Sequence, residues 1–338
     1  MDTAALTSFP FGRIIVSSVC AIFFLALILL SCRGRNQEVI GAGRAVLITG
    51  CDSGFGHHLA RRLDAQGFVV FAGCLFPNGD GAQTLHRESS SNMNILKLDV
   101  TKDEDVTQAR TVVQSNLPEK GLWAVVNNAG IVDWSETEWN TIDDYRIMAE
   151  VNLFGSIRTS IAFLPLVRAS KGRMVYVSSI FAFFNCLTMG AYSMSKRGLE
   201  AFADCLRVEM ACFGVKVSII QPGNFGPSTS ILRRRRTGTD IWEKLDRERQ
   251  QMFNRQYVDL ANNYHMSTCM TGNQDSSLVI DAMVDALTAD RPKRRYLLVS
   301  KLDMLFFYSF PYLPTYVTDA VFYLSPMYNK RKAMLYSK

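Results

Sequence analysis

The sequence predicts a doubly wound α/β domain, in which helices cover both faces of a parallel sheet. Three observations predict it. Strand and helix patterns alternate from residue 44 onward, the strands are continuous apolar runs, and the first strand ends at a glycine-rich turn. The 338 residues are 48% hydrophobic and 20% charged, which excludes a disordered or collagen-like chain. A net charge of +6 is too small to indicate nucleic-acid binding, so no such partner is expected.

The first half of the domain follows this alternation closely. A short apolar run at residues 45–49 is the first strand, and residues 55–66 form a helix because apolar residues recur on one face. Gly67 is a natural end for that helix. Further strands are indicated at residues 68–75, 95–98 and 122–127.

The second half continues the alternation with one interruption. Residues 227–275 are polar, charged and helical with few strand signals, so we expect a helical insertion on the substrate side. The main domain would then span residues 44–300. Its remaining elements are a helix at 142–167, a strand at 173–178, a helix at 192–211, a strand at 215–221, a helix at 279–289 and a strand at 296–299.

The N-terminal segment is predicted to anchor the chain in a membrane. Residues 14–32 are 19 uncharged and mostly apolar residues, long enough to cross the hydrocarbon core as a transmembrane helix. No small-residue cleavage site follows, which argues against a cleaved signal peptide. We therefore expect residues 1–35 to form a retained anchor. The basic residues after the span favour a cytosolic location for the main domain.

The C-terminal segment, residues 301–338, contains a second apolar stretch. Pro311 and Pro314 interrupt it, so it is a poor membrane span. Two interpretations stay open: a helical lid that lies on a membrane, and a packed tail. The basic residues 330–332 at its end would suit contact with a lipid surface.

A glycine-rich turn connects the first strand to the first helix. In this context glycines permit a tight turn and let backbone N–H groups reach a pyrophosphate at the helix N-terminus. The turn therefore predicts a dinucleotide-binding site of the Rossmann type. Its residues are Thr49, Gly50, Asp52, Ser53, Gly54, Phe55 and Gly56.

The turn and the motifs after it resemble the short-chain dehydrogenase/reductase family. The turn has T-G-x-x-x-G-x-G spacing, and Tyr192-x-x-x-Lys196 opens the helix at 192–211. The other family motifs, in order along residues 44–300, are Asp99, Asn128-Ala129-Gly130, Asn152, Ser179 and Pro222-Gly223. The resemblance implies an oxidoreductase that interconverts a hydroxyl and a carbonyl with a nicotinamide dinucleotide.

The resemblance also implies a role for each of these residues. Tyr192 would be the catalytic acid/base, because a cation one helical turn away, Lys196, lowers the pKa of a phenol. Lys196 would also hold the nicotinamide ribose, Ser179 the substrate oxygen, and Asn152 a water behind Lys196. Asp99 would neighbour the adenine. The remaining cofactor contacts would come from Asn128, Ala129, Gly130, Pro222 and Gly223.

The sequence favours NAD over NADP as the cofactor. The second strand ends in Cys74-Leu75-Phe76, without an Arg or Lys to meet a 2′-phosphate, and Asp52 would repel that phosphate. One position departs from many retinol enzymes of the family, which carry a threonine five residues after the proline. Pro227 stands there, so we expect Ser228 or Thr229 to contact the nicotinamide carboxamide.

Within the family, the glycine turn and residues 198–202 resemble the branch of membrane-bound retinol, oxidising hydroxysteroid and mitochondrial 3-hydroxybutyrate dehydrogenases. The loop 180–187 has three phenylalanines and no cation, so we expect Ser179, Phe181 and Phe184 to contact an apolar substrate. A hydroxysteroid is favoured and retinol is the alternative. 3-Hydroxybutyrate is a further alternative, which requires a cation from residues 233–236 to reach the pocket.

Other expectations concern partners and location. The eight cysteines and four histidines show no metal-ligand spacing, so no metal is expected and the histidines are interpreted as structural. The resemblance implies a homo-oligomer built through the long helices. The anchor indicates a membrane enzyme of the endoplasmic reticulum that contacts membrane lipid, with a mitochondrial location as the alternative. A non-catalytic dinucleotide-binding scaffold is the alternative from another class.

Overall fold

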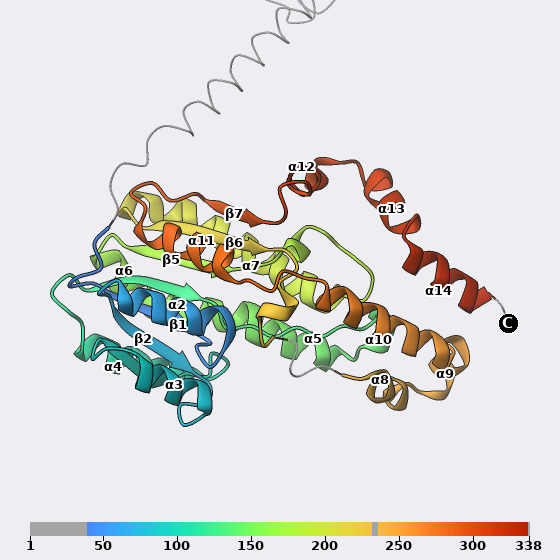
Figure 1. Cartoon of the computed structure of the whole chain (residues 1–338), viewed down its shortest axis with the longest axis horizontal. Coiled ribbons are helices and arrows are strands. Elements are labelled where there is room, and N and C mark those ends of the chain that lie inside the picture. Colours follow the sequence, from blue (N-terminus) through green and yellow to red (C-terminus); the bar gives the residue numbers. More distant parts are fainter. Residues whose placement is uncertain (1–38, 232–235, 337–338) are drawn as a thin grey trace, which may run out of the picture. The chain divides into compact units, whose positions relative to one another are not determined.

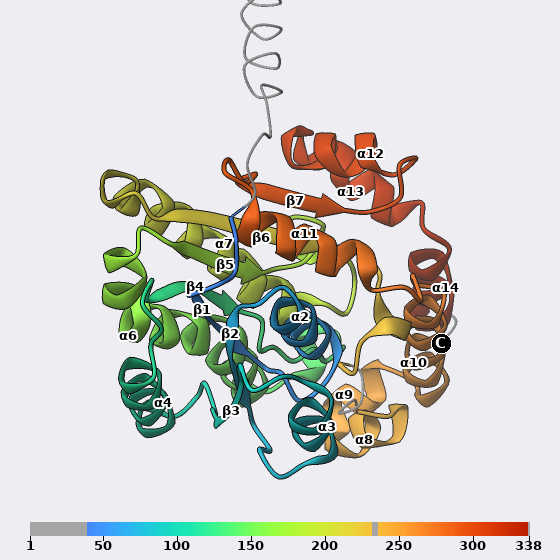
Figure 2. The same cartoon turned by 60° about the vertical axis from the view of Figure 1, so that its left-hand side comes forward.

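A computed structural model describes residues 39–231 and 236–336. Their strands form one parallel seven-stranded sheet (Figure 1), in the order β3-β2-β1-β4-β5-β6-β7 that the labels of Figure 2 follow. The winding direction reverses between β1 and β4, so the predicted Rossmann-type fold is confirmed. The predicted membrane span, residues 14–32, lies outside the described residues.

The strands are short and almost entirely buried, as expected for a sheet covered on both faces. Every strand predicted from the sequence is present, and its ends differ by no more than two residues. The strands are β1 (Ala45–Thr49), β2 (Val69–Cys74), β3 (Met93–Lys97), β4 (Leu122–Asn127), β5 (Arg173–Val177), β6 (Lys216–Pro222) and β7 (Arg295–Leu298).

Helices pack against both faces of this sheet (Figure 2). Two of them, α3 and α4, have no counterpart among the predicted elements. In each of these helices only two or three apolar residues are buried against the core. So few residues give too weak a periodic pattern to predict a helix from the sequence. One face carries α2 (Gly54–Ala65), α3 (Asp80–Glu88) and α11 (Ser277–Thr288); the other carries α4 (Asp103–Ser115), α6 (Gly155–Ala169) and α7 (Gly190–Met210).

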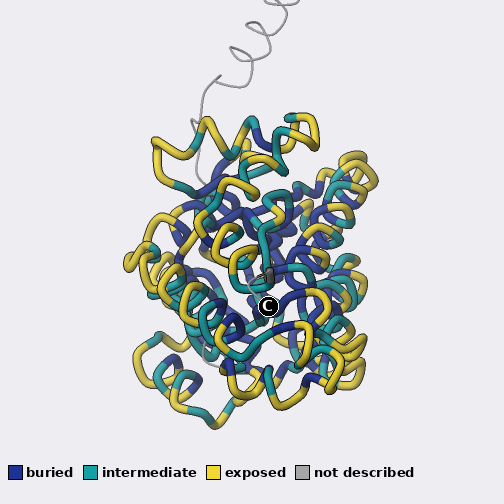
Figure 3. The backbone as a smooth tube through the Cα atoms, turned by 90° about the vertical axis from the view of Figure 1, so that its right-hand side faces the viewer, coloured by how far each residue is buried: buried dark blue, intermediate teal, exposed yellow. Residues whose placement is uncertain are grey.

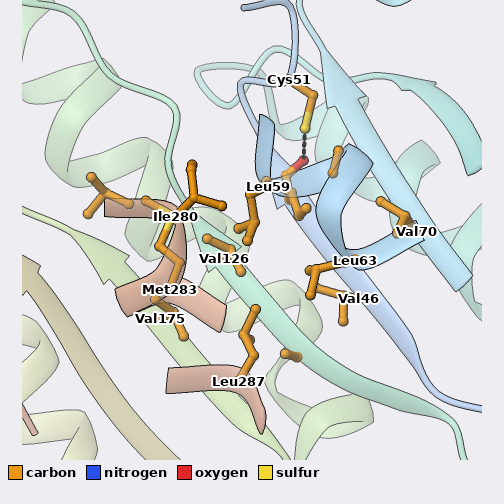
Figure 4. Packing of buried hydrophobic residues seen from close by; sticks show 14 of the residues in the cluster. Val46, Cys51, Leu59, Leu63, Val70, Val126, Val175, Ile280, Met283 and Leu287 are labelled. Carbon is orange, nitrogen blue, oxygen red and sulfur yellow. Dashed lines mark hydrogen bonds between the residues drawn. The ribbon is translucent and has the colours of Figure 1, made fainter. Parts of the chain in front are cut away.

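Alternating strand residues divide the core into two layers. In β1, Val46 packs in the layer of α2 and α11, whereas Leu47 faces the opposite layer. Figure 4 shows Leu63 of α2 beside Val46 and Leu59 of α2 beside Val126, with Leu287 of α11 in the same cluster. Buried backbone accordingly lies inside the fold and exposed backbone on its outer helices and loops (Figure 3).

The helix predicted at residues 142–167 is interrupted. It consists of α5 (Ile142–Ala149), a π-helical turn (Glu150–Phe154) and α6. By length and composition alone, residues 142–169 could cross a membrane. Phe163 of this helix is nevertheless part of the layer that packs on β4 and β5, so the helix is a core helix here.

Helices also occupy the region of the expected insertion and the C-terminal segment. The first group is α8 (Gly238–Lys244), α9 (Arg247–Met252) and α10 (Arg255–Met270); the second is α12 (Met304–Ser309), α13 (Thr315–Tyr323) and α14 (Pro326–Tyr336). Glu136, in the loop after β4, accepts two hydrogen bonds from Arg331 of α14 at 2.9 Å and one from Tyr257 of α10. At α14, therefore, the C-terminal segment is packed against the domain.

Substitution of Phe163 tests whether this helix belongs to the core. Phe163 is 0% exposed, whereas Ile161 on the same helix is 68% exposed. We expect Phe163→Ala to lower the free energy of unfolding by about 3–5 kcal/mol, through lost burial and a residual cavity. Ile161→Ala, the matched control, should change it by less than about 0.5 kcal/mol. Denaturant unfolding measures both, and equal effects would contradict this packing.

Candidate active site

Hydrogen bonds between the carboxyl ends of β1 and β4 hold the glycine turn. The Thr49 hydroxyl accepts the backbone N–H groups of Asn128 and Ala129 at 3.0 and 2.9 Å. The Asn128 amide donates in return to the carbonyls of Thr49 and Gly50 at 2.9 and 3.1 Å. Gly50 has φ +71°, and a Cβ there would lie 2.9 Å from the Ala129 Cα. Glycine is therefore required where the turn passes β4.

A cavity of about 840 Å³ lies at this edge of the sheet. Two predicted cofactor residues, Thr49 and Gly56, do not line it. The Thr49 hydroxyl is instead occupied by its hydrogen bonds to the segment after β4. A Cβ on Gly56 would lie 2.5 Å from the Gly50 carbonyl oxygen, so this glycine lets α2 pack beneath the turn. The predicted cofactor residues that line the cavity are Gly50, Asp52, Ser53, Gly54, Phe55, Asp99, Asn128, Ala129, Gly130, Tyr192, Lys196, Pro222 and Gly223.

One buried polar atom in the cavity wall fits a nicotinamide cofactor. Thr229 lines the cavity, and its buried hydroxyl has no hydrogen-bond partner among the described residues. Ser228, the other candidate for the carboxamide contact, donates its hydroxyl to the Phe225 carbonyl at 3.1 Å. A buried unpaired hydroxyl is costly, so a carboxamide next to Thr229 would satisfy it. The glycine turn and this hydroxyl together fit a nicotinamide dinucleotide.

Two carboxylates lie at the dinucleotide end of the cavity. Asp52 accepts the backbone N–H groups of Leu75 and Phe76 at 2.9 and 2.8 Å, which ties the glycine turn to the end of β2. Asp99 accepts the N–H and hydroxyl of Thr101 at 3.0 and 2.7 Å. Lys196, beside Tyr192, is the only lysine or arginine in the described cavity wall, and Asp99 pairs with Lys102, outside that wall, at 3.9 Å.

Helix α7 brings Tyr192 and Lys196 to the end of β5. Both side chains are buried, and the Lys196 ammonium lies 5.7 Å from the centre of the Tyr192 ring. Lys196 donates to the Val177 carbonyl at 2.8 Å. Ser179, two residues after Val177, makes a side-chain hydrogen bond with Tyr192. The structure therefore brings Ser179, Tyr192 and Lys196 together.

Burial, rather than Lys196, dominates the ionisation of Tyr192. Burial raises the pKa of Tyr192 to about 12, and the hydrogen bond with Ser179 acts in the opposite direction. Burial also lowers the pKa of Lys196 to about 8, against the effect of the Glu200 charge. The Tyr-x-x-x-Lys spacing predicts a lowered Tyr192 pKa. The protein groups give a raised one because burial disfavours both the phenolate and the cation that would stabilise it.

Asn152 does not line the cavity. Its side-chain amide donates to the Ile131 carbonyl at 2.9 Å and the Ser195 hydroxyl at 3.0 Å, and its oxygen accepts the Ile131 N–H at 2.8 Å. Asn152 lies in the π-helical turn, a local geometry that is frequent at functional sites. It therefore holds the segment after β4 against α7. Its contact with a relay water stays a prediction.

Segments far apart in the chain line the other end of the cavity. Phe181 and Phe184 come from the loop after β5, as predicted, and Phe322 from α13. The rings of Phe184 and Phe322 pack with centroids 5.1 Å apart. His265 of α10, one of the histidines expected to be structural, lines the cavity and stacks on Trp134 with ring centroids 5.5 Å apart. No local sequence signal places α10 or α13 there.

A doubly wound sheet with a glycine turn at its first crossover, and a buried Tyr–Lys pair in the cleft, defines a dinucleotide-dependent oxidoreductase. Residues 44–240 match the family model for short chain dehydrogenase. The chain belongs to the short-chain dehydrogenase family. It is a dehydrogenase that acts on CH–OH donors, with NAD(P) as its cofactor.

Three curated relatives differ in the substrate that their names give. The chain is 44% identical over 261 residues to D-beta-hydroxybutyrate dehydrogenase, mitochondrial, of Bos taurus, covering 75% of this chain and 76% of that protein. It is 39% identical over 295 residues to retinol dehydrogenase 7 of Mus musculus, covering 86% and 92%. It is 38% identical over 295 residues to 17-beta-hydroxysteroid dehydrogenase type 6 of Homo sapiens, covering 85% and 90%.

The fold is also found among solved structures. A short-chain dehydrogenase from Streptomyces avermitilis matches with a TM-score of 0.65 at 23% identity, over 86% of this chain and 98% of that one. Similarity at this level of identity concerns the fold alone. The relatives therefore identify the family and reaction class, while their names differ in the substrate.

The burial of Lys196 should cost stability at neutral pH. Its pKa falls from 10.5 to about 8, so the unfolded chain binds more protons between these values and stability rises with pH across that window. After allowing for the lost hydrogen bond, we expect Lys196→Met to raise the free energy of unfolding by about 2 kcal/mol at pH 7. The gain should vanish above about pH 10.

Urea unfolding at pH 7 and pH 10 measures this effect. Lys301→Met is the matched control, because Lys301 is exposed and its replacement should change stability by less than about 0.5 kcal/mol at either pH. A Lys196→Met protein that is less stable than the wild type at pH 7 would show that burying this lysine does not cost stability.

Proposed function

We propose that this protein is an NAD-dependent dehydrogenase of an apolar lipid alcohol, with a hydroxysteroid as the favoured substrate and retinol as the alternative. The main support for this proposal is the apolar lining of the cavity at the end beyond Tyr192. Phe181, Phe184, Leu187, Met189 and Phe322 contribute to its wall. Lys196 is the only lysine or arginine in the described lining, and it belongs to the acid/base pair. Such a lining suits an apolar ligand with one reacting polar group.

The residues around β5 would handle the proton of the reaction. We assign Tyr192 to take the proton from the substrate hydroxyl during oxidation and to return it during reduction. Ser179, already bonded to Tyr192, would hold the substrate oxygen, and the nearby Lys196 charge would favour the phenolate. When bound, the nicotinamide supplies the hydride acceptor. Asn152 would keep the segment after β4 in place against α7.

3-Hydroxybutyrate is the second candidate substrate, because the bovine relative that is 44% identical bears that name. A small carboxylate would need a cation or several donors in the pocket. Arg236, the described member of the basic run, instead pairs with Asp133 and Asp144 and donates to Asn140. The other members of that run lie outside the described residues. The contacts of Arg236 favour the apolar substrate.

The cofactor preference follows from charge at the end of β2. Asp52 lies against the backbone of Leu75 and Phe76, the place where a 2′-phosphate would need a cation. We therefore propose NAD rather than NADP.

The location and organisation of the chain are part of the proposal. We propose an anchor at residues 1–35, a catalytic domain at 44–300 with its insertion at 227–275, and attachment to the endoplasmic reticulum. Support comes from the exposed apolar and aromatic side chains of the C-terminal helices, such as Leu305 at 80% and Tyr316 at 76% exposure. The name of the bovine relative keeps a mitochondrial location as the alternative.

A substrate panel tests the proposed reaction. Membrane-embedded protein is given NAD with hydroxysteroids, retinol or 3-hydroxybutyrate, and NADH formation is followed by absorbance. We expect a hydroxysteroid or retinol to be oxidised, and Tyr192→Phe to lower kcat by at least about 100-fold because it removes the acid/base. Tyr308→Phe, at a tyrosine 54% exposed on α12, is the control and should retain activity. Oxidation of 3-hydroxybutyrate alone would overturn the apolar-substrate proposal.

Leu75→Arg tests the cofactor preference. We expect the wild type to prefer NAD over NADP by at least about tenfold in kcat/KM. A guanidinium at position 75, next to the end of β2, should raise kcat/KM with NADP by about tenfold or more through a charge-assisted hydrogen bond to the 2′-phosphate. Leu75→Gln, with similar size and no charge, should not. Equal use of both cofactors by the wild type would contradict the charge argument.

A further inference from the structure

A buried carboxylate with no role in the proposed reaction lies one helical turn beyond Lys196. Glu200 of α7 is only 4% exposed. Its Oε1 accepts hydrogen bonds from the Ser178 hydroxyl and the Gln221 amide, both at 2.8 Å. Its Oε2 accepts one from Arg295 of β7 at 2.6 Å. Three donors from three strand ends therefore converge on one carboxylate.

The hydrogen-bond partners of Glu200 adjoin residues of the candidate site. Ser178 directly precedes Ser179, and Gln221 directly precedes Pro222, which lines the cavity. The carboxylate therefore fixes the carboxyl ends of β5 and β6 against α7, the helix that carries the acid/base pair. Loss of this junction would displace the end of β5 from Tyr192.

The charge of Glu200 also acts on Lys196. Burial lowers the pKa of Lys196, and the Glu200 charge opposes that shift. Tyr192 on α7 lies beside Lys196, Arg295 on β7 contacts Glu200, and Asp204, one turn further along α7, pairs with Arg207 as well as with Arg295. Arg295 bonds both Glu200 and Asp204, so one guanidinium is shared by two carboxylates.

We propose that Glu200 is a positioning residue for the dehydrogenase reaction: it holds the end of β5 in place and keeps Lys196 charged beside Tyr192. The inference rests on the acid/base part of the proposed function and is independent of which alcohol is the substrate. An uncharged side chain of the same shape could preserve part of the hydrogen bonding. Only a carboxylate also supplies the negative charge that a buried ammonium needs.

The pH dependence of kcat/KM for alcohol oxidation tests the charge of Glu200. In Glu200→Gln the Lys196 ammonium loses a stabilising charge, so the Tyr192 phenolate loses its cation and forms only at higher pH. We expect the midpoint of the profile to rise by about 0.5 pH unit or more. Glu200→Asp retains the charge and should restore the midpoint toward the wild-type value. A purely structural defect would lower activity at every pH without moving the midpoint.

Arg295→Gln provides an independent variant with the opposite sign. Removing the guanidinium leaves the Glu200 charge uncompensated, which stabilises the Lys196 ammonium and should lower the midpoint. Asp204→Asn is the matched control: it removes the other carboxylate that binds Arg295, one turn further from Lys196, and should leave the midpoint unchanged. If Glu200→Gln does not fold, the pH profile of Arg295→Gln tests the proposal instead. An unchanged or raised midpoint in Arg295→Gln would then overturn it.

The proposed role of Glu200 is also overturned if folded Glu200→Gln has the wild-type midpoint. It is likewise overturned if Asp204→Asn shifts the midpoint as much as Glu200→Gln does. Failure of the proposed function looks different, because no alcohol would then be oxidised in a Tyr192-dependent way. In that case the affinity for NADH, measured by nucleotide fluorescence as a function of pH, is compared between Glu200→Gln and the wild type. Affinity should weaken at a lower pH in Glu200→Gln than in the wild type, because Lys196 loses its proton earlier, and identical pH dependence would overturn the role of Glu200.

Discussion

The site depends on how the carboxyl ends of β1 and β4 are joined. At this point the winding of the sheet reverses and leaves a crevice between the two strands. The side chains of Thr49 and Asn128 satisfy the polar backbone groups that the crevice would otherwise leave unpaired. Because a side chain from each of the two segments bonds the backbone of the other, the glycine turn and the segment after β4 are positioned as one unit.

A second constraint is that charge is buried beside Tyr192, where we propose that the proton is transferred. Lys196 and Glu200 lie almost out of reach of water, where each would be unstable alone. The protein surrounds them with a strand carbonyl, a hydroxyl, an amide and a guanidinium instead of solvent. These fixed dipoles and charges cost stability to assemble, and they need no reorganisation when the charge on the phenol changes.

The substrate end of the cavity has a different origin. Its wall combines a loop of the sheet domain with α10 and the C-terminal helices. The loop and the C-terminal segment approach each other through aromatic packing around Phe184. The ion pair of Glu136 with Arg331 holds α14 in place over this region. The proposed substrate contacts are therefore carried largely by segments outside the alternating strands and helices of the sheet domain.

The sequence by itself determined the strand positions, the reversal of the sheet and the residues of the glycine turn, because these follow from local periodicity, glycine geometry and motif spacing. It also singled out Ser179, Tyr192 and Lys196, which the structure brings together. Only the tertiary structure decided that Thr49, Gly56 and Asn152 support the cavity rather than line it, and that burial raises the Tyr192 pKa. Contacts such as those of Glu200 and His265 join residues distant in the chain. Hydrogen bonding and desolvation depend on such distances in space, which no local pattern records.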